Sequence, residues 1–293
     1  MTKLRSPYPW FGGKSKVAAQ VWGRFGKVRN YVEPFLGSAA MLLARPSPFE
    51  GSETVNDADC MVANFWRAIH SDPESVATWA DWPVNEADLH ARHLWLVNCT
   101  GEFSERMKSD PEYFDAKIAG WWVWGQCKWI GSGWCQQLPH LGDQGRGEIY
   151  DYFRLLAGRL RRVRVCCGDW SRVCGPTPTV KQGLTAVFLD PPYSDAAGRD
   201  ESLYATDCLR VAHDVREWCL DRGDDPRLRI ALCGYEGEHE CLERRGWCCV
   251  AWKARGGYAS QADHGNENAR KERIWYSPHC ISNRLPLFDR SPA

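Results

Sequence analysis

The sequence has no long apolar run, no excess of either charge and no Cys-x-x-Cys motif. No apolar stretch reaches the roughly 18 residues that a membrane-spanning helix needs, and residues 1–6 lack the apolar core of a signal peptide. The 37 basic and 37 acidic residues cancel, so any nucleic-acid partner must be bound by a local surface. We therefore expect a cytoplasmic protein that does not associate with a membrane.

The 14 cysteines follow neither a disulfide framework nor a metal-binding pattern. Two adjacent pairs are present, Cys166-Cys167 and Cys248-Cys249. This usage is typical of reduced thiols in a cytosolic protein. Cys127, Cys135 and His140 are the grouping that suggests zinc, but their spacing fits no compact ligand pattern, so we expect no metal.

Short strand-like runs alternate along the chain with stretches typical of helices. The strand-like runs cover residues 30–33, 54–56, 163–167, 185–189, 229–233, 249–252 and 273–276. The helical stretches cover residues 14–25, 38–44, 58–71, 147–161, 209–222 and 238–245. This alternation predicts an α/β fold with a Rossmann-like, mostly parallel sheet and helices on both faces.

The alternation breaks at residues 72–146, which contain many tryptophans, several glycines and no clear strand pattern. We predict a mostly helical inserted subdomain there, within a main domain formed by residues 1–71 and 147–293. The chain of 293 residues is long enough for this arrangement or for two modest domains.

The most informative motif is Asp190-Pro191-Pro192-Tyr193, which directly follows the apolar run at 185–189. The prolines lack N–H groups and fix φ at about −65°, so they make a rigid turn whose Pro191 carbonyl can point away from the sheet. A planar exocyclic amine has two hydrogens, which Asp190 and this carbonyl can accept while Tyr193 stacks on the ring. The simpler interpretation is a proline-rich turn between a strand and a loop.

Three other predicted strand ends carry groups suited to a nucleoside. The first strand leads through Glu33-Pro34-Phe35-Leu36-Gly37 into a helix, and Gly37 lets the backbone approach a ligand, although a plain βα turn is the alternative. Asp57 ends the second strand, where it can hold ribose hydroxyls or cap the next helix. Asp169 and Trp170 follow the third strand and can contact an adenine ring, or form an ordinary turn.

Near the N-terminus, Trp10-Phe11-Gly12-Gly13-Lys14 joins two rings, a flexible glycine pair and a cation. We expect this segment to close over a charged ligand, with Lys14 paired to the carboxylate of an amino-acid moiety and Trp10 covering its apolar stem. A solvated lysine beside packed aromatic rings is the alternative.

The segment at 10–14, the loop at 33–37, Asp57, Asp169-Trp170 and the Asp-Pro-Pro-Tyr turn follow one another along the chain. In this order they resemble the Dam-like adenine-N6 DNA methyltransferases (the D12, or alpha, class), which use S-adenosylmethionine. The resemblance spans both ends of the chain. It assigns to the cofactor Trp10, Lys14, Glu33, Phe35, Gly37, Asp57, Asp169 and Trp170, and to the flipped adenine Asp190, Pro191, Pro192 and Tyr193. One departure is that Ser38, Ala39 and Ala40, rather than a second glycine, follow Gly37.

The implied reaction is direct attack of adenine N6 on the methyl group, in line and without a covalent enzyme intermediate. Acceptors at Asp190 and Pro191 raise the nucleophilicity of the amine, and stacking on Tyr193 offsets part of the cost of flipping the base. The alternatives are methylation of cytosine N4, of RNA or of a protein glutamine, and a DNA-binding protein that has lost the chemistry. Asp190 at the first position of the turn favours adenine, by family resemblance.

Double-stranded DNA is thus the expected partner, in the cytoplasm of a bacterium or of a phage-infected host. The resemblance implies that residues 72–146 recognise the DNA target. Within them, Lys128, Gln136, Gln137 and His140 are candidates to read base edges, whereas most of the tryptophans are expected to form a packed core. The chain carries no nuclease-type constellation, so it either accompanies a separate restriction nuclease or acts alone.

Overall fold

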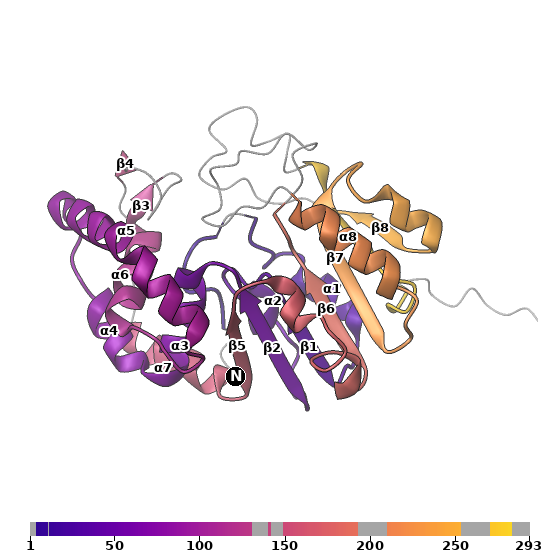
Figure 1. Cartoon of the computed structure of the whole chain (residues 1–293), viewed down its shortest axis with the longest axis horizontal. Helices are drawn as coiled ribbons and strands as arrows, with labels where there is room; N and C mark the ends of the chain where they lie inside the picture. The colour runs from indigo at the N-terminus through magenta and orange to yellow at the C-terminus, as the bar shows by residue number, and fades with distance from the viewer. Residues whose placement is uncertain are drawn as a thin grey trace, which may run out of the picture.

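A seven-stranded mixed β-sheet forms the centre of the molecule (Figure 1). The computed structural model describes residues 4–10, 12–130, 140–141, 149–192, 210–252 and 270–282. Across the sheet the strands are β5 (Val163–Cys167), β2 (Ser52–Asp57), β1 (Asn30–Glu33), β6 (Thr185–Leu189), β7 (Leu228–Tyr235), β9 (Glu272–Tyr276) and β8 (Cys248–Ala251). The first five are parallel to one another, and β9 is antiparallel to both of its neighbours.

The order in which the chain adds strands to the sheet reverses between the neighbouring strands β1 and β6. From β1 the chain moves outward through β2 to β5, and then crosses back to β6 and on to β7. Val32 of β1 pairs with Val187 of β6, so these two strands end side by side. Ligands of open α/β sheets bind at such a topological switch point, outside the carboxyl ends of the strands. The fold therefore brings the loops after β1 and β6 to the position where a ligand is expected.

The central strands are buried on both faces. Every residue of β1 and β6 is buried, and the side-chain NH₂ group of Asn30 donates to the Pro178 carbonyl at 2.7 Å and to Thr185 Oγ1 at 3.1 Å. Continuous apolar runs such as that of β6 are typical of parallel strands covered by helices on both sides. The predicted α/β class and mostly parallel sheet are confirmed, and the sheet is compatible with a Rossmann-like fold.

The helices between the strands begin and end close to the predicted bounds. They are α1 (Ala18–Phe25), α2 (Ala40–Leu43), α3 (Cys60–Ser71), α7 (Ile149–Leu160) and α8 (Val211–Arg222). The helix predicted from residue 14 begins only at Ala18, because Lys14 lies in the preceding turn and directs its side chain to Asp190. The helix predicted over 238–245 is instead the 3₁₀ helix η5 (Glu240–Arg245), which ends at Gly246 in the left-handed conformation.

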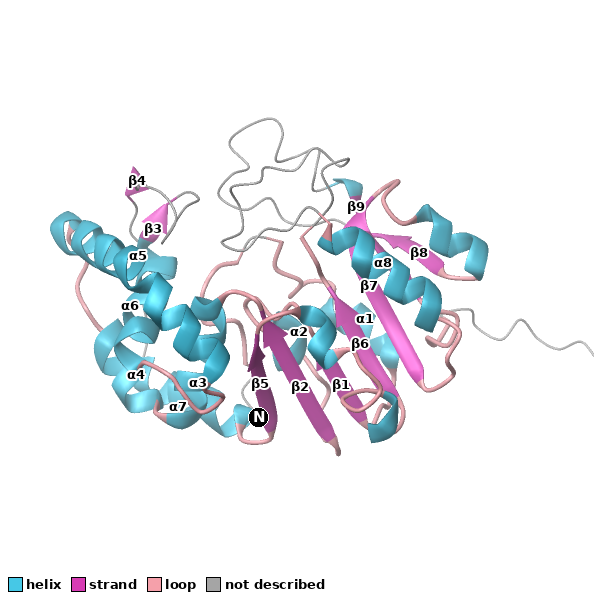
Figure 2. Cartoon of the chain, in the orientation of Figure 1, coloured by secondary structure: helices cyan, strands magenta, loops and turns pink. Residues whose placement is uncertain are grey.

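Residues 73–128 form three helices beside the β5 edge of the sheet (Figure 2). They are α4 (Pro73–Ala80), α5 (Glu86–Ser109) and α6 (Ala116–Lys128), followed by the antiparallel strands β3 (Trp129–Ile130) and β4 (His140–Leu141). Their apolar side chains, among them Val76, Leu96 and Trp122, join those of α3 and α7 in one continuous core. The described part of the 72–146 segment is thus mostly helical, and its separation as a subdomain stays a prediction.

Helix α5 is 24 residues long and carries charged residues in both its first and its last turn. Within the described ranges, no helix is both long enough and apolar enough to cross a membrane.

Candidate functional site

Loops from three neighbouring strands meet at the carboxyl edge of the sheet. β1 leads into residues 33–37, β6 leads into Asp190 and its two prolines, and β2 ends at Asp57. Lys14 reaches the same place from the N-terminal segment. We call this group the switch-point site: Lys14, residues 33–37, Asp57 and residues 190–192. It brings together the predicted catalytic turn and most of the predicted cofactor residues.

Lys14 and Asp190 form an ion pair within this site. Lys14 Nζ lies 2.9 Å from Asp190 Oδ2 and donates to the Gly12 carbonyl at 2.7 Å. The Lys14 side chain is only 4% exposed, whereas that of Asp190 is 23% exposed. Burial by itself lowers the pKa of Lys14, but the carboxylates of Asp190 and Glu272 outweigh it and raise that pKa above its ordinary value. Lys14 is therefore a permanent cation beside the Asp190 carboxylate.

Lys14 has a partner within the protein that the sequence did not suggest. The structure pairs Lys14 with Asp190, and its expected contact with the carboxylate of a ligand stays a prediction. The Trp252 ring lies 5.6 Å from Lys14 Nζ, and Glu272 contributes a second negative charge nearby. Sequence reasoning missed Trp252, which follows β8, and Glu272, which begins β9, because only the sheet topology brings these strands close to Lys14.

The turn after β6 rests on the protein core. Asp190 is partly exposed, Pro191 is buried and Pro192 is partly buried. The two prolines supply no N–H groups, so the turn presents acceptors rather than donors. Tyr193, which was expected to stack on the base, lies outside the described residues.

Gly37 is held on three sides. Its φ of 46° is in the left-handed region, its N–H donates to Asp57 Oδ2 at 2.8 Å, and its carbonyl accepts from Tyr8 Oη at 2.9 Å and from Trp66 Nε1 at 3.0 Å. A Cβ on Gly37 would lie 2.4 Å from Trp10 Nε1. The loop thus requires glycine here, both for its conformation and for the close approach of Trp10.

Tyr8 connects this loop to the helical layer. Besides donating to Gly37, its hydroxyl accepts from Trp66 Nε1 at 3.1 Å, and its ring packs edge-on against Trp122 of α6 with centroids 5.0 Å apart. Tyr8 is 4% exposed. Sequence reasoning missed Tyr8 and Trp66; the nearest signal was the position of Tyr8 two residues before Trp10.

Asp57 organises the ends of β1 and β2. Its Oδ2 accepts from Gly37 N–H, and its Oδ1 accepts from Asp59 N–H at 2.9 Å. Burial, followed by the nearby charge of Asp59, raises the pKa of Asp57 to about 7. A carboxylate offers about four acceptor positions, so Asp57 keeps capacity for ligand hydroxyls after these two bonds. Its predicted role with a ribose stays a prediction.

Asn56 ties the loops of three strands together. Its side-chain amide donates to the Pro34 carbonyl at 3.0 Å and to the Gly168 carbonyl at 2.9 Å, and its backbone carbonyl accepts from Leu36 N–H at 2.9 Å. Gly168 N–H in turn donates to the Asp57 carbonyl at 2.9 Å. Asn56 was not predicted as a site residue, although its position at the end of the predicted strand, directly before Asp57, was a usable signal.

The predicted adenine-contacting pair, Asp169 and Trp170, follows β5. Asp169 is exposed and caps the short 3₁₀ helix η1 (Trp170–Val173) by accepting from Ser171 N–H at 2.9 Å, which is the turn role considered as the alternative. Trp170 is buried and stacks on Phe35, with ring centroids 6.2 Å apart and planes inclined by 27°. The loops after β1 and β5 are therefore in contact.

Glu33 is more deeply buried than its predicted contact with a cofactor suggests. It is 2% exposed, and Tyr31 Oη donates to its Oε2 at 2.8 Å. Burial raises the pKa of Glu33 above its ordinary value. The hydrogen bond from Tyr31 fixes the Glu33 side chain within the switch-point site, and direct contact of Glu33 with a cofactor stays a prediction.

The predicted DNA-reading residues are only partly described. Lys128 is 6% exposed at the end of α6, and this burial disfavours direct contact with DNA. Gln136 and Gln137 lie outside the described residues, and His140 is described by its backbone in β4 alone. Trp122 and Trp124 are buried, as a packed core requires. Arg92 lies near three tryptophan rings, 4.4 Å from the Trp124 centroid.

In the described part of the chain, no three His, Cys, Asp or Glu side chains form a cluster able to hold a metal ion. Cys127 Sγ instead donates to the Pro7 carbonyl at 3.5 Å, and Cys135 lies outside the described residues.

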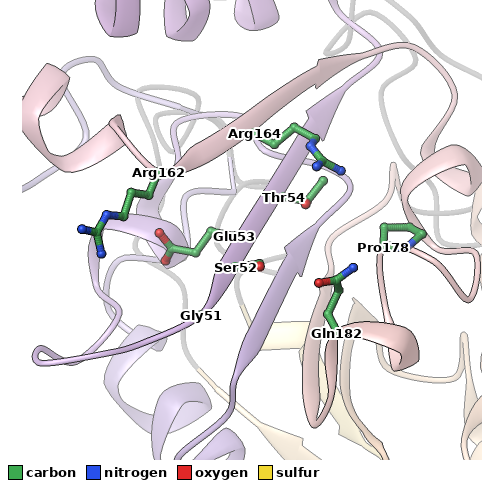
Figure 3. A pocket seen from close by; sticks show the side chains of 8 residues that line it. All are labelled: Gly51, Ser52, Glu53, Thr54, Arg162, Arg164, Pro178 and Gln182. Carbon is green, nitrogen blue, oxygen red and sulfur yellow. The ribbon is translucent and has the colours of Figure 1, made fainter.

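A pocket of about 160 Å³ lies near the amino-terminal ends of β2 and β5 (Figure 3). Arg162, Arg164, Ser52, Thr54 and Gln182 are among the residues that line it. These strand ends are opposite the edge that carries Asp190, and the pocket contains none of the predicted site residues.

No protein-family model matches the chain, and no curated protein matches it. The functional argument therefore rests on the switch-point site.

Proposed function

We propose that this protein is an S-adenosylmethionine-dependent DNA methyltransferase that modifies N6 of an adenine flipped out of the duplex. The observation that carries the proposal is the meeting of the Asp190 turn with the Gly37 loop at the switch point. One edge of the sheet thus combines a loop suited to a nucleoside with a carboxylate suited to an exocyclic amine.

The strand order supports a nucleoside ligand at this edge. Numbered along the chain within the sheet, the five parallel strands lie in the order third, second, first, fourth, fifth. Dinucleotide-binding sheets share this order and bind their ligands where it reverses. In this protein the reversal lies between β1 and β6, which carry the two motifs.

The residues around Gly37 fit a nucleoside cofactor. Gly37 is fixed by Asp57 at 2.8 Å, and Trp10 comes too close to it for any larger residue. Asp57 retains acceptor capacity for ribose hydroxyls, and Asp169 is exposed at the neighbouring strand end. S-adenosylmethionine, when bound, supplies a methyl group on a positively charged sulfur. The loop at 33–37, Asp57 and Asp169 would hold it.

On the substrate side, the Asp190 carboxylate accepts one hydrogen of the adenine amine and the Pro191 carbonyl accepts the other. These two bonds favour a pyramidal nitrogen and so make its lone pair available for attack. The Lys14 ion pair restrains the Asp190 carboxylate before the base arrives, which reduces the reorganisation needed during the reaction.

Transfer of a labelled methyl group tests this proposal. The purified protein is incubated with labelled S-adenosylmethionine and with unmethylated DNA, RNA or a protein mixture. We expect label in DNA, a loss of at least about 100-fold with Asp190→Ala, and full activity with Asp221→Ala, which alters an aspartate 70% exposed on α8. Label in RNA or protein would redirect the proposal to another exocyclic nitrogen, and transfer to no acceptor would overturn it.

A further inference from the structure

Two cysteines meet directly beside the switch-point site. Cys60 begins α3, three residues after Asp57, and Cys167 ends β5, directly before Gly168. The sheet register pairs Asp57 with Cys167, so both thiols lie at the carboxyl edge. Cys167 Sγ donates to Cys60 Sγ across 3.5 Å, and the two residues are 3% and 7% exposed.

We propose that Cys60 and Cys167 form an oxidation-sensitive dithiol, whose disulfide locks α3 to β5 beside Asp57 and weakens binding of the nucleoside cofactor. The formation of the disulfide stands on the thiol geometry alone. The effect on cofactor binding rests on the proposed function.

The environment favours Cys60 as the attacking thiolate. The hydrogen bond donated by Cys167 lowers the pKa of Cys60, although burial opposes this effect. Cys60 is also the first residue of a 12-residue helix, where the partial positive charge of the helix end stabilises a thiolate. Cys174 and Cys219 are buried too, but burial raises their pKa, so they are inert by comparison.

The chemistry is balanced with hydrogen peroxide as the oxidant. The Cys60 thiolate attacks one peroxide oxygen, which gives a sulfenic acid on Cys60 and releases hydroxide. Cys167 then attacks the Cys60 sulfur; the S–S bond forms, the sulfenic oxygen leaves with the thiol proton as water, and two electrons have passed from the thiols to the peroxide. Because both thiols are buried, a small oxidant is required.

We expect the closing of the bond to move the walls of the site. The sulfur atoms approach from 3.5 Å to about 2.05 Å, a shift of about 1.5 Å. Cys167 is bonded to Gly168, whose N–H and carbonyl hold the Asp57 carbonyl and the Asn56 amide. The movement therefore reaches the residues that position Asp57. Misplacement of a binding group by about 1 Å is enough to weaken its contacts severely.

The test treats the full chain with hydrogen peroxide, blocks the remaining thiols and identifies disulfide-linked peptides by mass spectrometry. We expect a link between Cys60 and Cys167 that dithiothreitol reverses. Cys60→Ser and Cys167→Ser should each abolish it. Cys166→Ser is the matched control, because the neighbouring strand residue points to the other face of the sheet and its loss should leave the link intact.

Cofactor affinity is measured on the same samples by titration with S-adenosylmethionine. We expect oxidation to weaken binding at least fivefold in the wild type and in Cys166→Ser, but not in Cys60→Ser. Absence of the Cys60–Cys167 link, or a link that leaves the affinity unchanged, would overturn the inference. If the reduced protein binds no S-adenosylmethionine, the proposed function fails, and the mass spectrum still decides whether the dithiol forms.

Discussion

Lys14 Nζ lies 2.9 Å from Asp190 Oδ2, so an ion pair between a buried lysine and a partly exposed aspartate joins the N-terminal segment to the turn after β6. The carboxylate expected to receive the substrate amine is therefore restrained by a residue distant in the chain. A second carboxylate, Glu272, helps to keep Lys14 charged. Removal of either member of the pair should consequently affect both folding and transfer, and the two effects can be separated.

Replacement of Lys14 by methionine leaves Asp190 without its cation. We expect Lys14→Met to lower the free energy of unfolding by about 3 kcal/mol, the lower end of the range for buried pairs, because Asp190 is partly exposed. The double variant Lys14→Met with Asp190→Asn should recover much of this stability without recovering methyl transfer. Urea unfolding measures the first effect; equal instability of the single and double variants would show that the two residues are not coupled.

Substitution of Gly37 tests the cofactor loop. Gly37→Ala forces a side chain into the left-handed region and to 2.4 Å from Trp10 Nε1, so it should cost about 1–3 kcal/mol of stability and weaken S-adenosylmethionine binding. Gly101→Ala is the matched control, because a Cβ there meets nothing within 4 Å on helix α5. That control should be neutral or stabilising by up to about 1 kcal/mol. A Gly37→Ala protein with wild-type cofactor affinity would contradict the assigned loop.

Loss of the Tyr8 hydroxyl should weaken cofactor binding more than it lowers the stability of the fold. Tyr8→Phe keeps the ring against Trp122 but leaves the Gly37 carbonyl with Trp66 alone, so we expect a loss of about 1 kcal/mol in stability. Calorimetric titration should show several-fold weaker binding of S-adenosylmethionine. Tyr152→Phe, which removes a hydroxyl bonded to exposed Arg5, should leave the affinity unchanged. Equal behaviour of the two variants would argue against a positioning role for Tyr8.

The pKa of Asp57 predicts a pH dependence of stability. Folding raises this pKa to about 7, from about 4 in an unfolded chain. Between these values the folded protein keeps a proton that the unfolded chain has lost, so the free energy of unfolding falls as the pH rises through this window. Asp57→Asn keeps an acceptor for Gly37 and should reduce that fall, whereas Asp221→Asn should not. Thermal melts between about pH 4 and 7 give the answer; identical slopes in Asp57→Asn and wild type would refute it.

Much of the fold could be predicted from local pattern. The strands β1, β5 and β6 have the predicted bounds, because each is a short strand-like run bounded by polar or turn-forming residues. The end of β1 and the end of β6 could also be assigned to one edge, because parallel strands present their carboxyl ends together.

The contacts between side chains within the site could not be predicted. The ion pair of Lys14 with Asp190 and the hydrogen bond from Tyr8 to Gly37 join residues far apart in the chain. Hydrophobic periodicity in the sequence does not indicate such long-range contacts. The sequence pattern also did not predict the burial of single side chains. Lys128 was a candidate for DNA contact because lysine is usually exposed, yet it is 6% exposed. Tyr193 stays a prediction from its motif.

The most direct test of the central claim is the identity of the methylated nucleoside. Unmethylated DNA is incubated with the protein and S-adenosylmethionine, digested to nucleosides and analysed by mass spectrometry, with Asp190→Ala in parallel. Our account predicts N6-methyldeoxyadenosine with the wild type and none with Asp190→Ala. Unmodified DNA from a folded protein that binds S-adenosylmethionine, or N4-methyldeoxycytidine in place of the adenine product, would contradict it.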